Sequence, residues 1–174
     1  MEGYDPTIIA FVCNWCTYTA ADLAGTSRLS YPPNVRMIRM MCTGMVDPKY
    51  VVKALLEGAD AVLISGCHPN DCHYVEGNYK MLRRFQMLKR MLKDLGIEDE
   101  RVRLEWISAA EGEKVKRVIN EMVGQVQKLG PLGIPQKFED WDKEMEHFAA
   151  EVAAKDAASA CTCAAQEKPA LAPA

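Results

Sequence analysis

The sequence predicts an α/β protein built around a four-stranded parallel sheet. Four short apolar runs alternate with four amphipathic helical patterns between residues 7 and 129. Such alternation is typical of a parallel sheet whose helices cross over with right-handed connections. In addition, three of the four runs lead directly into cysteine-containing segments. The sheet therefore has helices on both faces and a cysteine-rich edge in this prediction.

The first strand is expected over residues 7–12, a partly β-branched apolar run. Residues 17–29 have the alanine and leucine spacing of a helix that packs closely on a sheet. Pro32 and Pro33 end that segment because proline cannot continue a helix. Residues 35–40 alternate apolar and basic side chains only in part, which predicts a second strand near the edge of the sheet.

Asp47 and Pro48 mark the start of the second helix, as N-cap and first helical residue. Gly58 is expected just beyond the end of this helix. Residues 61–65 form a continuous apolar run, which is the pattern of a central parallel strand buried on both faces. The third strand is therefore placed in the middle of the sheet.

Residues 77–95 carry large apolar side chains at three- and four-residue spacing, surrounded by lysine and arginine, and predict a long helix with a basic exposed face. Residues 102–107 alternate as a fourth strand does. A last helix is expected over residues 108–129, with Ser108 and Glu111 as a capping box. Together these elements predict a flavodoxin-like sheet with the strand order 2-1-3-4.

The chain is divided into three parts in this interpretation. Residues 1–130 form the α/β domain, and residues 131–148 form an extension with aromatic and acidic side chains, interpreted as a docking segment. Residues 149–174 are rich in alanine and poor in large apolar side chains, which predicts a flexible tail. Cys161 and Cys163 lie in this tail and receive no ligand role.

Composition excludes several classes of function. The 174 residues include 21 basic and 24 acidic side chains, for a net charge of −3, which offers no electrostatic basis for binding nucleic acid. No apolar stretch approaches the roughly 20 residues that span a bilayer, and the first residues do not resemble a signal peptide. A cytoplasmic location is expected, where seven cysteines are better interpreted as ligands or catalytic thiols than as disulfides.

Five cysteines follow the first three strands: Cys13, Cys16, Cys42, Cys67 and Cys72. Because the carboxyl ends of parallel strands lie at one edge of a sheet, these thiols are expected to meet there. An iron–sulfur cluster with two irons needs about four protein ligands. Cys13, Cys42 and Cys67 stand at the strand ends and are the first candidates, while the choice between Cys16 and Cys72 stays open.

Other chemistry can use the same residues. Cys13 and Cys16 form a Cys-x-x-Cys pair that would suit a thiol–disulfide oxidoreductase, and structural zinc could bind a set of these thiols in an interaction module. The cysteines could also be buried as small apolar side chains. His68 and His73 are expected to form hydrogen bonds or face solvent. No nucleotide-binding loop and no serine nucleophile motif occurs, which favours electron transfer over catalysis.

Seven segments resemble the small iron–sulfur subunit, or delta subunit, of the methyl-viologen-reducing hydrogenase (the MvhD family). They are residues 10–16, 21–25, 31–36, 41–44, 66–74, 76–78 and 105–112. The resemblance covers about residues 7–129. Members often have a second cysteine before the position of Cys13, where this chain has Val12, so no ligand is expected there.

The resemblance implies a non-catalytic subunit with one [2Fe-2S] cluster. It would relay electrons between a donor module and the flavin-containing A subunit of heterodisulfide reductase, where the flavin splits electron pairs. The donor would be a hydrogenase, a formate dehydrogenase or another electron-donating complex. Asn14, Trp15, Pro69 and Asn70 are expected to surround the cluster, and the basic helix over residues 77–95 is a candidate docking surface.

Overall fold

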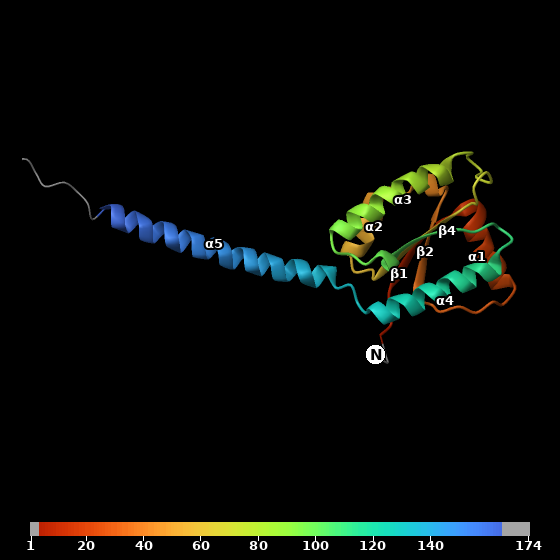
Figure 1. The fold of residues 1–174 in the computed structure, drawn as a ribbon. Helices are drawn as coiled ribbons and strands as arrows, with labels where there is room; N and C mark the ends of the chain where they lie inside the picture. The colour runs from red at the N-terminus through yellow and green to blue at the C-terminus, as the bar shows by residue number, and fades with distance from the viewer. Residues whose placement is uncertain (1–3, 165–174) are drawn as a thin grey trace, which may run out of the picture. The chain divides into compact units, whose positions relative to one another are not determined.

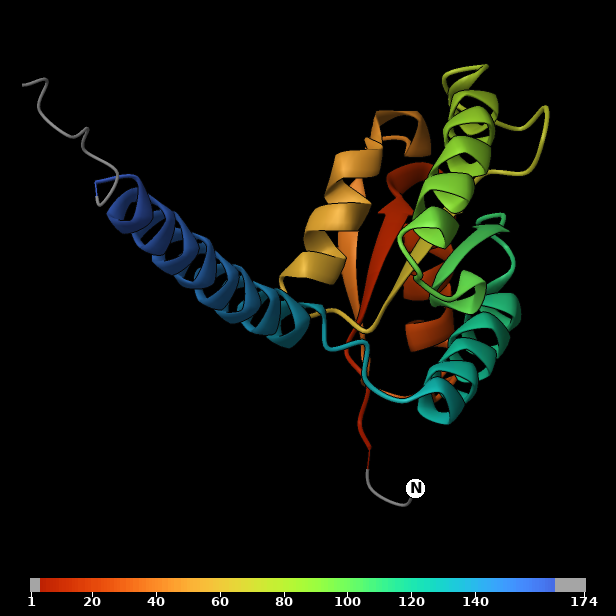
Figure 2. The same cartoon turned by 60° about the vertical axis from the view of Figure 1, so that its left-hand side comes forward.

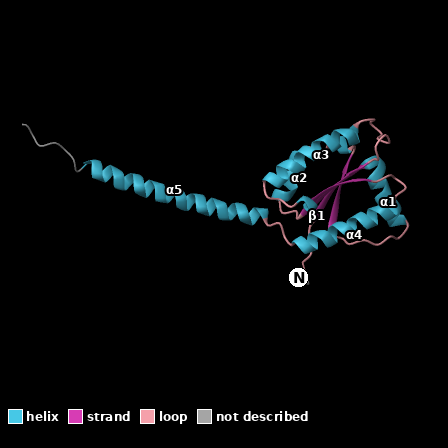
Figure 3. Ribbon diagram, viewed as in Figure 1, coloured by secondary structure: helices cyan, strands magenta, loops and turns pink. Residues whose placement is uncertain are grey.

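The computed structural model describes residues 4–164, without the side chains at positions 135, 137, 138, 154 and 156–164. Its strands are β1 (Ile8–Cys13), β2 (Val35–Met40), β3 (Ala61–Gly66) and β4 (Val102–Trp106). Its α-helices are α1 (Thr19–Thr26), α2 (Pro48–Leu56), α3 (Gly77–Asp94), α4 (Gly112–Leu129) and α5 (Ile134–Ala164). The strands form one parallel sheet in the order β2-β1-β3-β4 (Figure 3), which confirms the predicted α/β fold and strand order.

Helices cover both faces of the sheet (Figure 1 and Figure 2). Ala10 and Val12 of β1 belong to a buried cluster with α1 and α4, whereas Phe11 belongs to a second cluster with α2 and α3. In β3, Leu63 joins the first cluster and Ile64 joins the second. Successive side chains of a strand point to opposite faces, so a sheet covered on both sides needs apolar residues at every position. This is the physical reason for the continuous apolar run of β3.

The register brings the carboxyl ends of the strands to one edge. Cys13, the last residue of β1, pairs with Met40, the last residue of β2. Gly66 at the end of β3 pairs with Trp106 at the end of β4. The loops that follow the strands therefore leave the sheet side by side.

A buried guanidinium group, that of Arg101, lies at the amino-terminal ends of the strands, opposite to the cysteines. Arg101 Nε donates to Glu98 Oε2 over 2.6 Å, and its Nη1 donates to the carbonyl oxygens of Asp60 and Gly130 over 3.1 and 3.0 Å. The Asp60 carboxylate accepts from the Thr7 amide over 2.9 Å. A buried charge is tolerated only when it is paired and hydrogen-bonded. These contacts therefore hold the amino-terminal ends of the strands in place, at the end of the sheet opposite to the cysteines.

Two helix starts differ from the sequence-based expectation. The segment after β1 begins with a π-helical turn, Asn14–Tyr18, before α1 takes over. The helix expected from Ser108 begins only at Gly112, so that prediction is wrong by four residues. The Glu111 carboxylate does accept from the Ser108 amide over 2.6 Å, as in a capping box, but inside a turn that precedes α4.

Helix α4 approaches α1 closely at its first residue, Gly112. A Cβ atom added there would lie 3.1 Å from the Ala24 amide nitrogen and 3.3 Å from the Ala20 carbonyl oxygen. A side chain at this position would require the backbone of α1 to give by a few tenths of an ångström. The first turn of α4 therefore packs closely against α1.

The chain divides into two units, Met1–Ile134 and Pro135–Ala174. The second unit contains nearly all of α5, a single helix that continues across residues 148 and 149 to Ala164. Positions 165–174 of the predicted tail, and the side chains of Cys161 and Cys163, lie outside the described residues. Within residues 4–164, no helix combines the length and apolar character needed to cross a bilayer.

Candidate metal centre

Three of the cysteines form a compact group at the carboxyl edge of the sheet. Cys13 ends β1, Cys16 lies in the π-helical turn that follows, and Cys67 comes directly after β3. Their sulfur atoms all lie within 4.8 Å of one another, and Cys13 Sγ is 3.8 Å from Cys67 Sγ. All three residues are buried. The turn between Cys13 and Cys16 thus folds both thiols of the Cys-x-x-Cys pair onto Cys67.

The other two cysteines form a pair beside this group. Cys42 follows β2 and is buried, and Cys72 lies half-buried in the loop between β3 and α3. Their sulfur atoms are 3.9 Å apart, and Cys72 also packs against the group of Cys13, Cys16 and Cys67. The structure therefore brings together all five thiols that the sequence singled out, in one group of three and one neighbouring pair.

The sulfur spacing fits binding to a metal. A tetrahedral metal bound at about 2.3 Å by thiolates holds two of its sulfur ligands roughly 3.8 Å apart. The distances Cys13–Cys67 and Cys42–Cys72 both match this value. Two thiol pairs at this spacing, side by side, can each hold one metal atom with little movement of the chain.

Backbone amides surround the sulfur atoms. Cys13 accepts from the amides of Trp15 and Cys16, and Cys67 accepts from the amide of His73. Cys42 accepts from the amide of Gly44. Cys72 accepts from three amides, those of Tyr74, Gly77 and Asn78. The contact from the Gly44 nitrogen to Cys42 Sγ measures 3.4 Å. The last two amides facing Cys72 belong to the first turn of α3, where the helix dipole is positive. Such donors stabilise thiolates and the sulfur atoms of a cluster.

The same contacts divide the thiols by acidity. Hydrogen bonds from Cys16 and Cys67 lower the pKa of Cys13 to about 3. The Cys13 side chain in turn raises the pKa of Cys67 to about 12 and raises the pKa of Cys16. Burial raises the pKa of Cys42. Burial also opposes ionisation of Cys72, but the surrounding amides lower its pKa overall. Each group therefore contains one cysteine that favours the thiolate form, which is the form that binds metals.

Two glycines make room for the Cys42–Cys72 pair. A Cβ atom on Gly77 would lie 2.0 Å from Cys42 Sγ and 3.1 Å from Cys72 Sγ. A Cβ atom on Gly44 would lie 2.9 Å from the Gly77 Cα. The sequence reasoning missed both glycines as part of the site. One feature of the sequence could have indicated the role of Gly77: glycine is a poor helix former, yet it stands at the first position of a long predicted helix.

Asn78 is a further residue that the sequence reasoning missed. Its side chain is buried, and its Nδ2 donates to the carbonyl oxygens of His68 and Cys67 over 2.7 and 3.3 Å. It thereby joins the start of α3 to the loop that carries Cys67 and Cys72. Buried amides of this kind fix loops because an unsatisfied carbonyl is costly.

Replacing Asn78 by alanine is expected to lower the free energy of unfolding by about 1–3 kcal/mol, since a buried and a partly buried carbonyl group lose their donor. Denaturant unfolding under anoxic conditions measures the change. The matched control is Asn120→Ala, because Asn120 is exposed and donates to the Lys116 carbonyl of its own helix, over 2.8 Å. An equal effect of both variants would contradict the role given to Asn78.

The four residues expected around the cluster lie in the loops of this edge. Trp15 is 43% exposed, stacks on the His73 ring at 4.0 Å and donates from Nε1 to the Tyr74 hydroxyl over 3.4 Å. Together with Cys16, Cys67 and Cys72, Trp15 and Asn70 line a hollow of about 400 Å³. Pro69 is exposed, and the Asn14 carbonyl accepts from the Thr19 hydroxyl over 3.1 Å.

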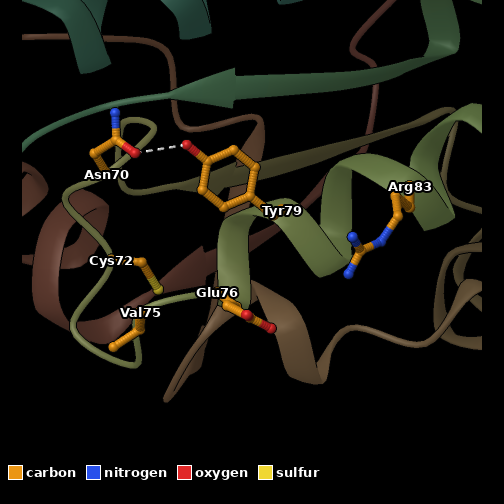
Figure 4. A pocket seen from close by; sticks show the side chains of 6 residues that line it. All are labelled: Asn70, Cys72, Val75, Glu76, Tyr79 and Arg83. Atoms are coloured by element: carbon orange, nitrogen blue, oxygen red, sulfur yellow. Dashed lines mark hydrogen bonds between the residues drawn. The ribbon is translucent and has the colours of Figure 1, made fainter.

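A second hollow lies on the α3 side of Cys72 (Figure 4). It measures about 410 Å³ and is lined by Asn70, Cys72, Val75, Glu76, Tyr79 and Arg83. The Tyr79 hydroxyl donates to Asn70 Oδ1 over 2.8 Å, as the dashed line in the figure shows. Asn70 and Val75 have positive φ angles of 67° and 65°. A β-branched residue in this region is strained, so the loop around Cys72 is held in shape by its surroundings.

His68 takes part in a contact away from the sulfur atoms. Its Nε2 lies 2.7 Å from Glu111 Oε2 in the turn before α4. The Ser108 amide and then His68 lower the pKa of Glu111 to about 2. His73 stacks on the Trp15 ring and meets the Tyr74 ring edge-on, so both histidines contact side chains other than the five thiols.

Comparison with known proteins places the chain in a family. The family model described as "Methyl-viologen-reducing hydrogenase, delta subunit" matches residues 8–130. The chain belongs to this family. The delta-subunit family thus covers the whole sheet and all five clustered cysteines, and its match ends before α5.

Individual delta-subunit relatives are similar over the same region. The iron–sulfur D subunit of the F420-non-reducing hydrogenase of Archaeoglobus profundus is 55% identical over 131 residues, which are 75% of this chain and 96% of that protein. The iron–sulfur D subunit of the F420-non-reducing hydrogenase vhc of Methanococcus voltae is 54% identical over 135 residues, 78% of this chain and 94% of that protein.

A different arrangement occurs in Methanosarcina acetivorans. The A subunit of its ferredoxin/F(420)H(2)-dependent CoB-CoM heterodisulfide reductase is 48% identical over 128 residues, which are 74% of this chain but only 16% of that protein. In that relative, a region similar to this chain is part of one much longer polypeptide.

Proposed function

We propose that this chain is an electron-transfer subunit that holds one [2Fe-2S] cluster at the carboxyl edge of its sheet. The observation that carries the proposal is the arrangement of five thiols as two adjacent groups, with Sγ–Sγ distances of 3.8 Å and 3.9 Å. A two-iron cluster takes two protein ligands on each iron, and two neighbouring pairs supply them. A single zinc ion binds four ligands around one atom, which would not explain why the thiols form two separate groups.

Cys13 and Cys67 are proposed as one ligand pair, and Cys42 and Cys72 as the other. Cys16 is then the spare thiol. Its sulfur lies within 4.8 Å of both Cys13 Sγ and Cys67 Sγ and contacts the Thr17 hydroxyl over 3.8 Å. In this position Cys16 supports the site by hydrogen bonding. Asn14, Trp15, Pro69 and Asn70 shape its surroundings.

The cluster supplies one-electron oxidation and reduction, and the chain's own residues tune and expose it. The amides that face the sulfur atoms stabilise added negative charge and so raise the reduction potential. Trp15, Met41, Met45 and Tyr74 are exposed apolar side chains on the same loops. Met and aromatic residues are enriched at protein interfaces, so this rim fits a partner that brings its own redox group close.

The names of the relatives suggest which proteins this chain works with. We propose a hydrogenase, a formate dehydrogenase or another donor on one side, and the flavin-bearing A subunit of a heterodisulfide reductase on the other, in a cytoplasmic electron-bifurcating complex. The names of the relatives support both sides, since they include hydrogenase iron–sulfur subunits and a heterodisulfide reductase A subunit. In this scheme residues 1–130 are the relay domain, and residues 131–148 are a docking extension that continues as helix into residues 149–164.

The test is electron transfer between purified components. The chain, purified without oxygen and reduced, is mixed in a stopped-flow instrument with the heterodisulfide reductase A subunit from the same source. Reoxidation of the chain with reduction of the flavin is expected, at a rate that rises with the concentration of the A subunit. Failure of electrons to pass in either direction would contradict the proposed role.

A further inference from the structure

Two hydroxyl groups are buried close to Cys16. Ser65 is fully buried, and Thr17 is 2% exposed. Their Oγ and Oγ1 atoms are 2.9 Å apart, which is the distance of a hydrogen bond. Because the two residues are 48 positions apart in the chain, this bond joins strand β3 to the turn that follows β1.

Ser65 is the one polar side chain of strand β3, since the residues from Ala61 to Ile64 are all apolar. By alternation along the strand, Ser65 points to the same face as Leu63, which belongs to the buried cluster with α1 and α4. Burying a hydroxyl group costs free energy unless it is hydrogen-bonded, and alanine would avoid that cost on an apolar face. The hydroxyl group of Ser65 therefore needs an explanation other than packing.

Thr17 connects Ser65 to the cysteines. It directly follows Cys16 in the π-helical turn Asn14–Tyr18, and π-helical turns are frequent at functional sites. Thr17 Oγ1 lies 3.8 Å from Cys16 Sγ, a contact in which either atom can be the donor. Cys16 Sγ in turn lies within 4.8 Å of the sulfur atoms of Cys13 and Cys67. A continuous chain of polar groups thus runs from Ser65 through Thr17 and Cys16 to the ligand pair.

The hydroxyl protons have one consistent arrangement if the Cys16 thiol donates toward the ligand pair. A thiol has a single proton to donate. When that proton points to a ligand sulfur, the Thr17 hydroxyl must donate to Cys16 Sγ. The Thr17 oxygen then accepts the proton of the Ser65 hydroxyl over 2.9 Å. In this arrangement Ser65 orients Thr17, and Thr17 orients Cys16.

We propose that Ser65 and Thr17 are positioning residues that hold the spare thiol of Cys16 as a hydrogen-bond donor to the ligand pair and so raise the reduction potential of the metal centre. A hydrogen bond to a sulfur ligand offsets the negative charge that reduction adds, which makes reduction more favourable. The two hydroxyl groups act through Cys16, whose sulfur lies beside the ligand pair. The inference rests on the proposed function, with Cys16 as the spare thiol.

The test is the reduction potential of the full chain purified without oxygen, measured by redox titration with visible absorbance. Thr17→Val removes one hydroxyl group with little change in volume, and Ser65→Ala removes the other. Each variant is expected to lower the equilibrium constant for one-electron reduction about three- to tenfold, where tenfold corresponds to about 59 mV. Thr17→Ser is the matched control, because it keeps the hydroxyl group and is expected to keep the wild-type potential.

A double-mutant cycle with Cys16→Ala separates positioning from a general change of polarity near the metal. Cys16→Ala alone is expected to lower the potential. Adding Thr17→Val or Ser65→Ala to it is expected to change nothing further, because no thiol remains to be held. Iron and sulfide analysis and circular dichroism verify that each variant folds and holds its metal centre.

Two kinds of result would overturn the inference while the proposed function stands. One is an unchanged potential in both Thr17→Val and Ser65→Ala, or an equal shift with and without Cys16, in chains that keep their iron and sulfide. The other is loss of iron in Cys16→Ala, which would make Cys16 a ligand rather than the spare thiol. A wild-type chain that holds no iron and sulfide would overturn the proposed function, and this inference with it.

Discussion

A Gly77→Ala variant is expected to fold but to bind iron much more weakly. The added Cβ would lie 2.0 Å from Cys42 Sγ, far inside contact distance. The Cys42 side chain can rotate away, so the fold survives, but its sulfur then leaves Cys72. Alanine also suits a helix better than glycine does, so α3 itself does not suffer. Disturbing the support of a metal ligand typically costs about 10- to 100-fold in metal affinity.

Iron content per chain after anoxic purification, together with visible absorbance, measures this effect. Gly124→Ala is the matched control, because Gly124 lies within α4 and an added Cβ there meets no atom of the described residues within 4 Å. The control variant is expected to keep the iron content of the wild type. Full iron content in Gly77→Ala would mean that the Cys42–Cys72 pair is not at the metal.

Serine substitutions at the five cysteines are expected to differ in how much of the cluster each variant loses. Among the residues that the structure describes, the one group of three close thiols is Cys13, Cys16 and Cys67, so neither member of the Cys42–Cys72 pair has a comparable replacement. Cys42→Ser and Cys72→Ser should therefore lose most of the cluster. Cys13→Ser and Cys67→Ser should lose much of it, although Cys16 lies within 4.8 Å of each and can substitute in part.

Cys16→Ser is expected to retain the cluster, with a shifted reduction potential because a hydrogen-bonding group near the cluster has changed. Iron and sulfide analysis of the five variants, with circular dichroism to verify folding, gives the order. Equal retention in all five would contradict the site, and greater loss in Cys16→Ser than in Cys67→Ser would contradict the proposed ligand pairs.

Much of the fold could be predicted because its signals are local or strictly periodic. Asp47 caps α2 by accepting from the Lys49 amide over 2.9 Å, and Pro48 is the first helical residue, both as expected from sequence. The continuous apolar run of residues 61–65 became the fully buried strand β3. Once four parallel strands are placed, the meeting of five thiols at one edge follows from the geometry of the sheet.

The remaining features depend on contacts between segments far apart in the chain. Sequence order places Cys42 and Cys72 at the same edge but does not tell which sulfur faces which. That Gly77 must lack a side chain follows only from its distance to Cys42. Helix α4 begins at Gly112, where it lies close to α1, and the local capping pattern does not show this contact. Packing between distant elements decided each of these points.

The central claim is that this chain holds a two-iron cluster on its clustered cysteines, and the most direct measurement is the metal and sulfide content of the protein purified without oxygen. Two iron and two sulfide per chain, with a brown colour and a visible spectrum that bleaches on reduction, are the predicted result. A colourless protein that contains zinc, or a metal-free protein whose Cys13 and Cys16 titrate as a disulfide, would contradict it.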